Sequence, residues 1–121
     1  MASWCRTRQN SSTGDAGLGF EDAREATGPS ESFKTESLYT DHLEANGLLE
    51  SHRQYFDMYL NGERPFPWEL PPSPLPAQDH LDMFIAGLAN DWLQDSPKDR
   101  PFYLQVNFGG PHDPWDAPSS Y

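Results

Sequence analysis

The fold is decided by residues 101–118, which read PFYLQVNF followed by GGPHDPWDAP. In the first eight residues, apolar side chains at every second position alternate with Tyr103, Gln105 and Asn107. A period of two, built from aromatic and β-branched residues, is typical of a strand with one buried face. We therefore predict a strand at about 102–108, ended by the two glycines that follow it.

The polar loop after this strand contains the candidate site residue. His112 and Asp113 lie between Pro111 and Pro114, and the two prolines restrict the backbone on both sides of the histidine. In α/β domains, ligands bind just beyond the carboxyl ends of strands. His112 therefore either contacts a ligand or hydrogen-bonds a loop carbonyl, and spacing alone favours neither interpretation.

Two helical patterns occupy the first half of the chain. Apolar residues recur at helical spacing over about 33–46 and again over 51–60. The first pattern ends at Asn46-Gly47, because glycine adopts the left-handed conformation that often follows a helix. We predict a helix in each range.

The clearest helical pattern covers 77–94. Leu81, Ile85 and Trp92 share one face, with charged residues largely on the other. This helix, a short polar link and the strand after it form half of an α/β unit. We expect an α/β domain made mainly of helices, with one clear strand at 102–108.

Composition and charge exclude several classes of protein. Eight basic residues against 19 acidic ones leave a net charge of −11 over 121 residues, so we expect neither a nucleic-acid partner nor an anionic membrane partner. We find no apolar run long enough to span a bilayer and no secretory signal near the start. The sequence assigns no compartment, and the cytoplasm is the default expectation.

Two stretches are expected to lie outside regular structure. Residues 1–17 have no apolar period and are interpreted as a disordered or unrelated start. Half of the twelve prolines lie between 65 and 76, which excludes a helix or a central strand there. That stretch either binds a partner as a proline-rich ligand or, through Phe66, Trp68 and Leu70, pins a loop to the core.

Three motifs resemble the middle of the sulfatase N-terminal domain, which belongs to the alkaline-phosphatase-like superfamily. They are the helix end at 91–93 (DWL), the strand start at 100–104 (RPFYL) and the loop at 110–115 (GPHDPW). With looser agreement further upstream, the resemblance covers 18–121. It implies part of a sulfatase domain with a parallel sheet.

The resemblance also implies a chemistry. Sulfatases hydrolyse sulfate esters with a formylglycine nucleophile and a bound calcium ion. The histidine of this loop binds the sulfate oxygens or assists the leaving group, and His112 matches it. A protonated imidazole is suited to that task, because charge develops on the leaving alkoxide.

The remaining parts of a sulfatase site are missing from this sequence. Cys5 lies in CRTRQ, which departs from the family's C-x-P-S-R motif at three positions, and no Asp-Asp pair is present to bind calcium. No metal ligand is assigned. We expect an internal fragment that is inactive alone, with the remainder of a split sulfatase domain as its possible partner.

Two alternatives remain open. The first alternative to a sulfatase fragment is a phosphatase or phosphodiesterase of the same superfamily. The second is a non-catalytic interaction protein that uses the proline-rich stretch at 65–76.

Overall fold

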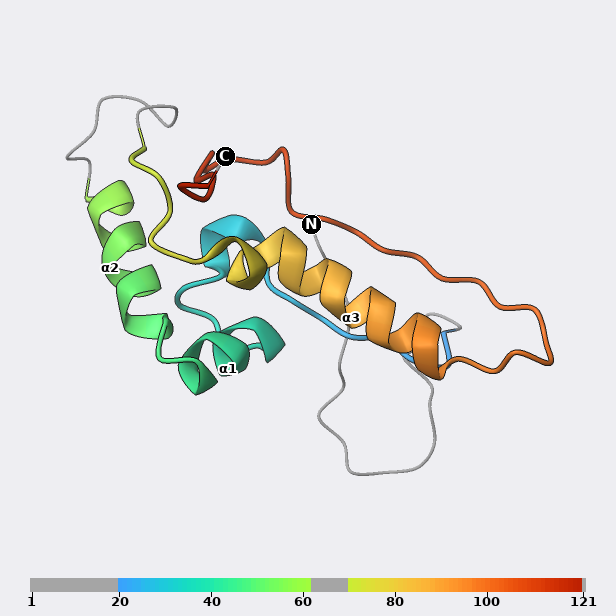
Figure 1. Cartoon of the computed structure of the whole chain (residues 1–121). Helices are drawn as coiled ribbons and strands as arrows, with labels where there is room; N and C mark the ends of the chain where they lie inside the picture. The colour runs from blue at the N-terminus through green and yellow to red at the C-terminus, as the bar shows by residue number, and fades with distance from the viewer. Residues whose placement is uncertain (1–19, 62–69, 121) are drawn as a thin grey trace.

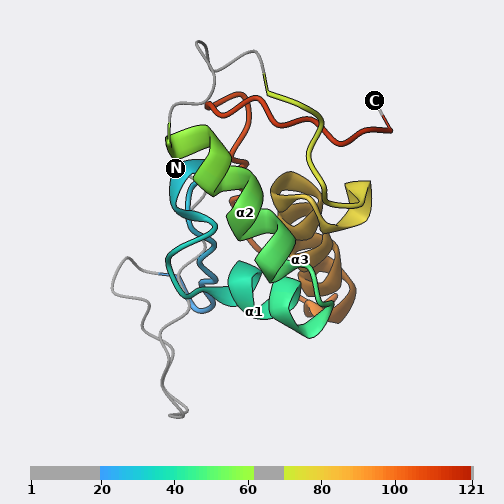
Figure 2. The same ribbon diagram turned by 90° about the vertical axis from the view of Figure 1, so that its left-hand side faces the viewer.

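The computed structural model describes residues 20–61 and 70–120. This part of the chain is mainly helical, with α1 (Leu38–Ala45), α2 (Leu49–Leu60) and α3 (Leu81–Asp95), and with 3-10 turns η1 (Pro29–Glu31) and η2 (Ala77–Asp79). α1 and α2 lie near one end of the long α3, and the chain after α3 returns along it (Figures 1 and 2). None of the described helices is long and apolar enough to cross a membrane.

Helix α1 is bounded by capping interactions at both ends. The Ser37 hydroxyl accepts hydrogen bonds from the backbone N–H groups of Tyr39 and Thr40, and the Thr40 hydroxyl accepts one from the Ser37 N–H. The helix therefore begins at Leu38, five residues later than the start predicted at about 33. It ends at Ala45 with Asn46 as its C-cap, and Gly47 follows in the left-handed conformation (φ 69°), as the predicted Asn46-Gly47 stop requires.

The other two helices also differ from their predicted starts. α2 begins two residues before the predicted 51. Within the helix predicted at 77–94, η2 occupies 77–79 and His80 has extended backbone angles (φ −66°, ψ 148°). α3 therefore begins only at Leu81. His80 leaves the helical path where its imidazole hydrogen-bonds the carbonyl oxygen of Asp116, 36 residues later.

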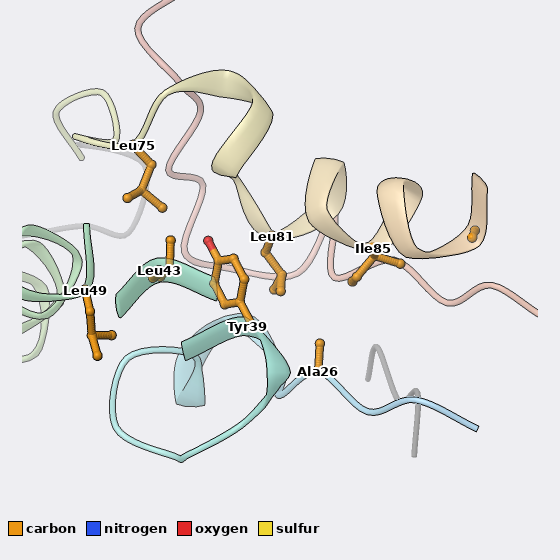
Figure 3. Packing of buried hydrophobic residues seen from close by; sticks show 8 residues of the cluster. Ala26, Tyr39, Leu43, Leu49, Leu75, Leu81 and Ile85 are labelled. Carbon is orange, nitrogen blue, oxygen red and sulfur yellow. The ribbon is translucent and has the colours of Figure 1, made fainter. Parts of the chain in front are cut away.

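The main core lies between α1 and α3. Tyr39 packs with Leu43 and Leu81, and its hydroxyl donates a hydrogen bond of 3.0 Å to the carbonyl oxygen of Asp79 (Figure 3). The buried members of this cluster are Ala26, Tyr39, Leu43, Leu49, Leu75, Leu81, Ile85 and Ala89.

A second, smaller cluster joins η1 to α2. The rings of Phe33 and Phe56 are stacked with their centroids 4.9 Å apart, and Tyr55 completes the buried set. Leu70 packs against it, as the loop-pinning interpretation expects for this residue. The other two residues of that interpretation, Phe66 and Trp68, lie outside the described residues, as do residues 1–17.

The predicted strand at 102–108 is not formed, so the predicted α/β class and parallel sheet are not supported. The segment runs beside α3 as a drawn-out trace (Figure 1), and among the described residues the β pairing is a single isolated bridge between Ser73 and Pro118. A strand requires a neighbour that completes its backbone hydrogen bonds. No described segment supplies one to 102–108.

The predicted alternation of faces is present only at the centre of this segment, because Phe102 and Phe108, which share the predicted buried face, are 51% and 48% exposed. Leu104 and Val106 pack against the main core. On the other side, the Tyr103 hydroxyl hydrogen-bonds the Gln105 side chain, which in turn donates to Asn107. The sequence pattern therefore predicts which of these side chains face the core, although it does not supply the partner that would make a strand.

We predict that Ile85 contributes strongly to folding stability, because its side chain is fully buried in the main core. Ile85→Val should lower the free energy of unfolding by about 1 kcal/mol and Ile85→Ala by about 2–5 kcal/mol. Met83, half exposed on the same helix, supplies the control: Met83→Ala should stay within about 0.5 kcal/mol of the wild type. Urea denaturation measures all three, and equal effects at 83 and 85 would contradict this core.

Candidate functional site

A small cavity of about 140 Å³ lies among η1, α2, the start of α3 and the loop at 110–117. Much of its wall is apolar and includes Tyr39, Phe56, Leu81 and Trp115. Its polar wall contains three of the four histidines of the chain together with two carboxylates; these are His52, His80, His112, Asp82 and Asp116. The loop with the predicted site residue thus closes one side of a real cavity.

The start of this loop is held by a carboxylate at the beginning of α3. The N–H of Gly109 donates to Asp82 Oδ1 at 2.8 Å, and the N–H of Gly110 donates to Oδ2 of the same carboxylate at 3.2 Å. Asp82 lies in the first turn of α3, where the helix dipole also favours a negative charge. A Cβ on residue 110 would lie 2.8 Å from Oδ2, so glycine permits this close approach.

The far end of the loop is held by a histidine–carboxylate pair. His80 Nε2 lies 3.1 Å from the carbonyl oxygen of Asp116 and 3.4 Å from its Oδ2, with both side chains largely buried. The hydrogen bond to the Asp116 carboxylate raises the pKa of His80, although burial acts in the opposite direction. The imidazole therefore fastens residue 116 to the start of α3.

His112 lies between these two attachments and lines the cavity. Its Nδ1 is 2.6 Å from the carbonyl oxygen of Asp113 and 3.3 Å from the Asp113 carboxylate. The hydrogen bond to a loop carbonyl, one of the two interpretations from sequence, is therefore present. It occupies Nδ1, and no hydrogen bond of Nε2 occurs within the described residues, so this nitrogen is available to a ligand.

The loop is further braced by two aromatic side chains. The indole N–H of Trp115 donates to the carbonyl oxygen of Pro111 at 3.0 Å, and the Tyr59 hydroxyl donates to Asp113 Oδ2 at 3.2 Å. The peptide bonds before Pro111 and Pro114 are both cis. The His112 side chain remains more than half exposed, so the loop holds its backbone without burying the imidazole.

A buried serine–histidine pair contributes to the cavity wall. Ser32 Oγ lies 3.0 Å from His52 Nε2 and donates to the carbonyl oxygen of Pro29 at 2.7 Å. Burial lowers the pKa of His52 to about 4, so its ring is neutral at pH 7. Because His52 Nδ1 has no partner among the described residues, no carboxylate orients the ring as in a serine hydrolase triad. The pair therefore serves packing rather than nucleophilic attack.

The remaining candidate residues do not assemble into a second site. His42 lies away from the cavity and pairs with Asp79 at 2.8 Å. Asp113 and Asp116 have different partners, and no three metal-ligating side chains converge within residues 20–61 and 70–120. These residues do not fit the oxygen-rich ligand set that calcium requires. Cys5 lies outside the described residues.

Sequence reasoning missed Asp82, Asp116 and Ser32 as site residues. Their partners are 27, 36 and 20 residues away, and no local motif predicts such pairs. The predicted helix start at 77 also placed Asp82 beyond the first turn, so its position in the first turn of α3 was not predicted.

Comparison with family models, with curated proteins and with solved structures finds no match for this chain. The interpretation of the site therefore depends on its own residues and on the resemblance of its sequence motifs.

The two buried histidines should affect stability in opposite directions as the pH changes. The pKa of His80 is raised in the fold above the ordinary 6.5, so its stabilising contribution is complete below pH 6.5 and is lost as the pH rises through the folded-state pKa. Besides Asp116, the titratable groups that interact with it are Asp82 and His52. For His52, stability is present above pH 6.5 and is lost as the pH falls toward about 4.

We predict that His80→Gln destabilises the protein most below pH 6.5, and that its difference from the wild type shrinks at alkaline pH. Urea denaturation of both proteins between pH 5 and pH 9 measures this difference. An NMR titration of the histidine side chains should give a midpoint near 4 for His52. A His80→Gln effect that does not change with pH would contradict the His80–Asp116 attachment.

Proposed function

We propose that this chain supplies the histidine loop of a sulfatase-like site, in which His112 binds the oxygens of a sulfate ester. The observation that carries the proposal is the position of His112: it lies in the GPHDPW motif, on a cavity wall, with Nδ1 hydrogen-bonded and the ring exposed. Such a ring is held in orientation by the loop while Nε2 can contact a ligand.

The charges around the cavity are compatible with an anionic ligand. Asp82 accepts hydrogen bonds from two backbone N–H groups, and Asp116 pairs with His80, so both carboxylates already have partners within the fold. A protonated imidazole at 112 would present an N–H donor to an anionic oxygen at the opening. Hydrogen bonds from a protonated imidazole to an anionic oxygen are about twice as strong as those between neutral groups.

The same site lacks what hydrolysis requires. The hydroxyl of Ser32 is buried and donates to the Pro29 carbonyl, so it is not available as a nucleophile. The described residues offer no calcium ligand set. We therefore propose that the chain is part of a sulfatase domain and needs the remainder of that domain for activity, since acid–base assistance alone contributes only about 10²–10⁴-fold.

The interaction-protein alternative is disfavoured by the described part of the proline-rich stretch. Ser73 and Leu75 are buried, Ser73 donates its N–H to the Ala117 carbonyl, and the Pro71 carbonyl accepts a hydrogen bond from Tyr55. A segment built into the fold in this way is not free to dock in a partner's groove. Residues 65–69 lie outside the described residues.

Binding is tested by adding sodium sulfate to the chain at pH 6 and following the histidine side-chain signals by NMR. We expect saturable shifts for His112 and smaller ones for His80, whereas His42, away from the cavity, stays unchanged. Sodium chloride at matched ionic strength supplies the salt control. In His112→Gln, the shift at His80 should weaken or vanish.

Equal, non-saturating drifts of all histidine signals would contradict the proposed sulfate site. Tighter binding of inorganic phosphate than of sulfate would favour the phosphatase alternative. In a parallel assay with 4-nitrophenyl sulfate and calcium, we expect no turnover above the buffer rate, because the cavity has no available nucleophile among the described residues. If the wild type turned the substrate over and His112→Gln did not, the chain would be a complete enzyme, which would contradict the proposal that it is a fragment.

A further inference from the structure

The segment at 102–108 exposes aromatic side chains and an unpaired backbone. Phe102 is 51% exposed, Tyr103 72% and Phe108 48%. Within the described residues, no backbone hydrogen bond joins 101–108 to another segment. Two nearby residues contact this region through their side chains. The Phe20 ring stacks on that of Tyr103, and the Glu21 carboxylate pairs with Arg100. An extended, apolar segment with free N–H and C=O groups is a template for pairing with another chain.

The sequence of this segment is symmetric about its central residue. Reading outward from Gln105, the chain has an aliphatic residue on each side, then Tyr103 or Asn107, and then a phenylalanine on each side. Antiparallel pairing of two copies about Gln105 would place Phe102 opposite Phe108 and Leu104 opposite Val106. A surface that matches itself under a twofold rotation is what a symmetric dimer requires.

This register also respects the faces seen in the single chain. Residues directly opposite each other in a β pair point to the same face. Leu104 would therefore face Val106 of the second copy on the side of α3, where both already pack against the core. Tyr103 would face Asn107 on the outer side, so the register keeps each of these side chains on the face it already has.

Charge favours the antiparallel direction. Residues 101–108 contain no charged side chain, although the chain carries a net charge of −11. Lys98 and Arg100, with Asp99 between them, precede the segment, whereas Asp113 and Asp116 follow it. Antiparallel pairing brings the basic end of one copy toward the acidic end of the other. Parallel pairing would instead bring like ends together.

We propose that two copies of this chain associate through an antiparallel β pair formed by residues 102–108, with a twofold axis at Gln105. A pair of seven-residue strands is smaller than a standard protein interface of about 1,600 Å². The dimer should therefore be weak and dependent on concentration. The proposal does not depend on sulfate binding.

Disulfide cross-linking in a Cys5→Ser background tests the register. Gln105→Cys faces itself across the axis at a Cα separation of about 4.5–5.5 Å, which is within the range for a disulfide. Under mild oxidation it should form a covalent dimer faster than the control Met83→Cys, which lies half exposed on α3. Tyr103→Cys should cross-link poorly to itself, because the two residues at position 103 lie four positions apart along the pair, a separation of about 14 Å. It should cross-link readily when mixed with Asn107→Cys.

Equal cross-linking at positions 105 and 83 would overturn the proposal. Faster self-linking of Tyr103→Cys than of Gln105→Cys would overturn the register. Sedimentation of the unmodified chain gives a second readout and should show a monomer–dimer equilibrium. Gln105→Pro, which removes one N–H from each copy and places a proline ring in the middle of the strand, should sediment as a monomer, whereas Gln105→Ser should still dimerise. Circular dichroism should show the same helix content in both variants, and a dimer that survives Gln105→Pro would also contradict the pairing.

Discussion

The arrangement of the cavity depends on the carboxylate of Asp82 at the start of α3. This group accepts hydrogen bonds from the consecutive backbone N–H groups of Gly109 and Gly110, and hydrogen bonds to a charged group stabilise by about 1.5–3 kcal/mol each. The helix dipole favours the same charge at the same place. Without this contact, the segment after 108 would have no polar attachment to α3 until Asp116.

The chemistry proposed for His112 follows from this attachment. The loop is held at one end by Asp82 and at the other by His80, so His112 lies on the cavity wall while its ring stays exposed. Reactive side chains are effective when the backbone that carries them is held and the side chain itself can reach a ligand. The site therefore combines a held histidine with a small, largely apolar cavity, and it lacks a nucleophile of its own among the described residues.

Local sequence signals predicted the helices well and their boundaries less well. The period of apolar residues placed α1, α2 and α3, and Gly47 marked the end of α1, because these features depend on residues close in sequence. The start of α1 depended on the cap at Ser37, and the start of α3 on a hydrogen bond from His80 to residue 116. The Ser37 cap is a local pattern that the predicted start at about 33 did not use, whereas the His80–Asp116 contact joins residues 36 apart and has no local pattern.

The predicted strand also shows what a local sequence pattern does not predict. Alternation correctly indicated that Leu104 and Val106 face the core, but a strand also needs a neighbour, which the sequence of the segment does not contain. Likewise, His112 was predicted as a site residue from its motif and lines the cavity, whereas Asp82 and Asp116, which hold its loop, were not predicted. A motif predicts a candidate residue more readily than the contacts that position it.

Amide hydrogen exchange at Gly109 and Gly110 tests the central claim most directly. In dilute protein, where copies do not pair, both amides should exchange many times more slowly than those of Tyr103 and Gln105, and Asp82→Ala should remove the difference. Exchange of the two glycine amides at the rate of an unstructured peptide in the wild type would contradict the account.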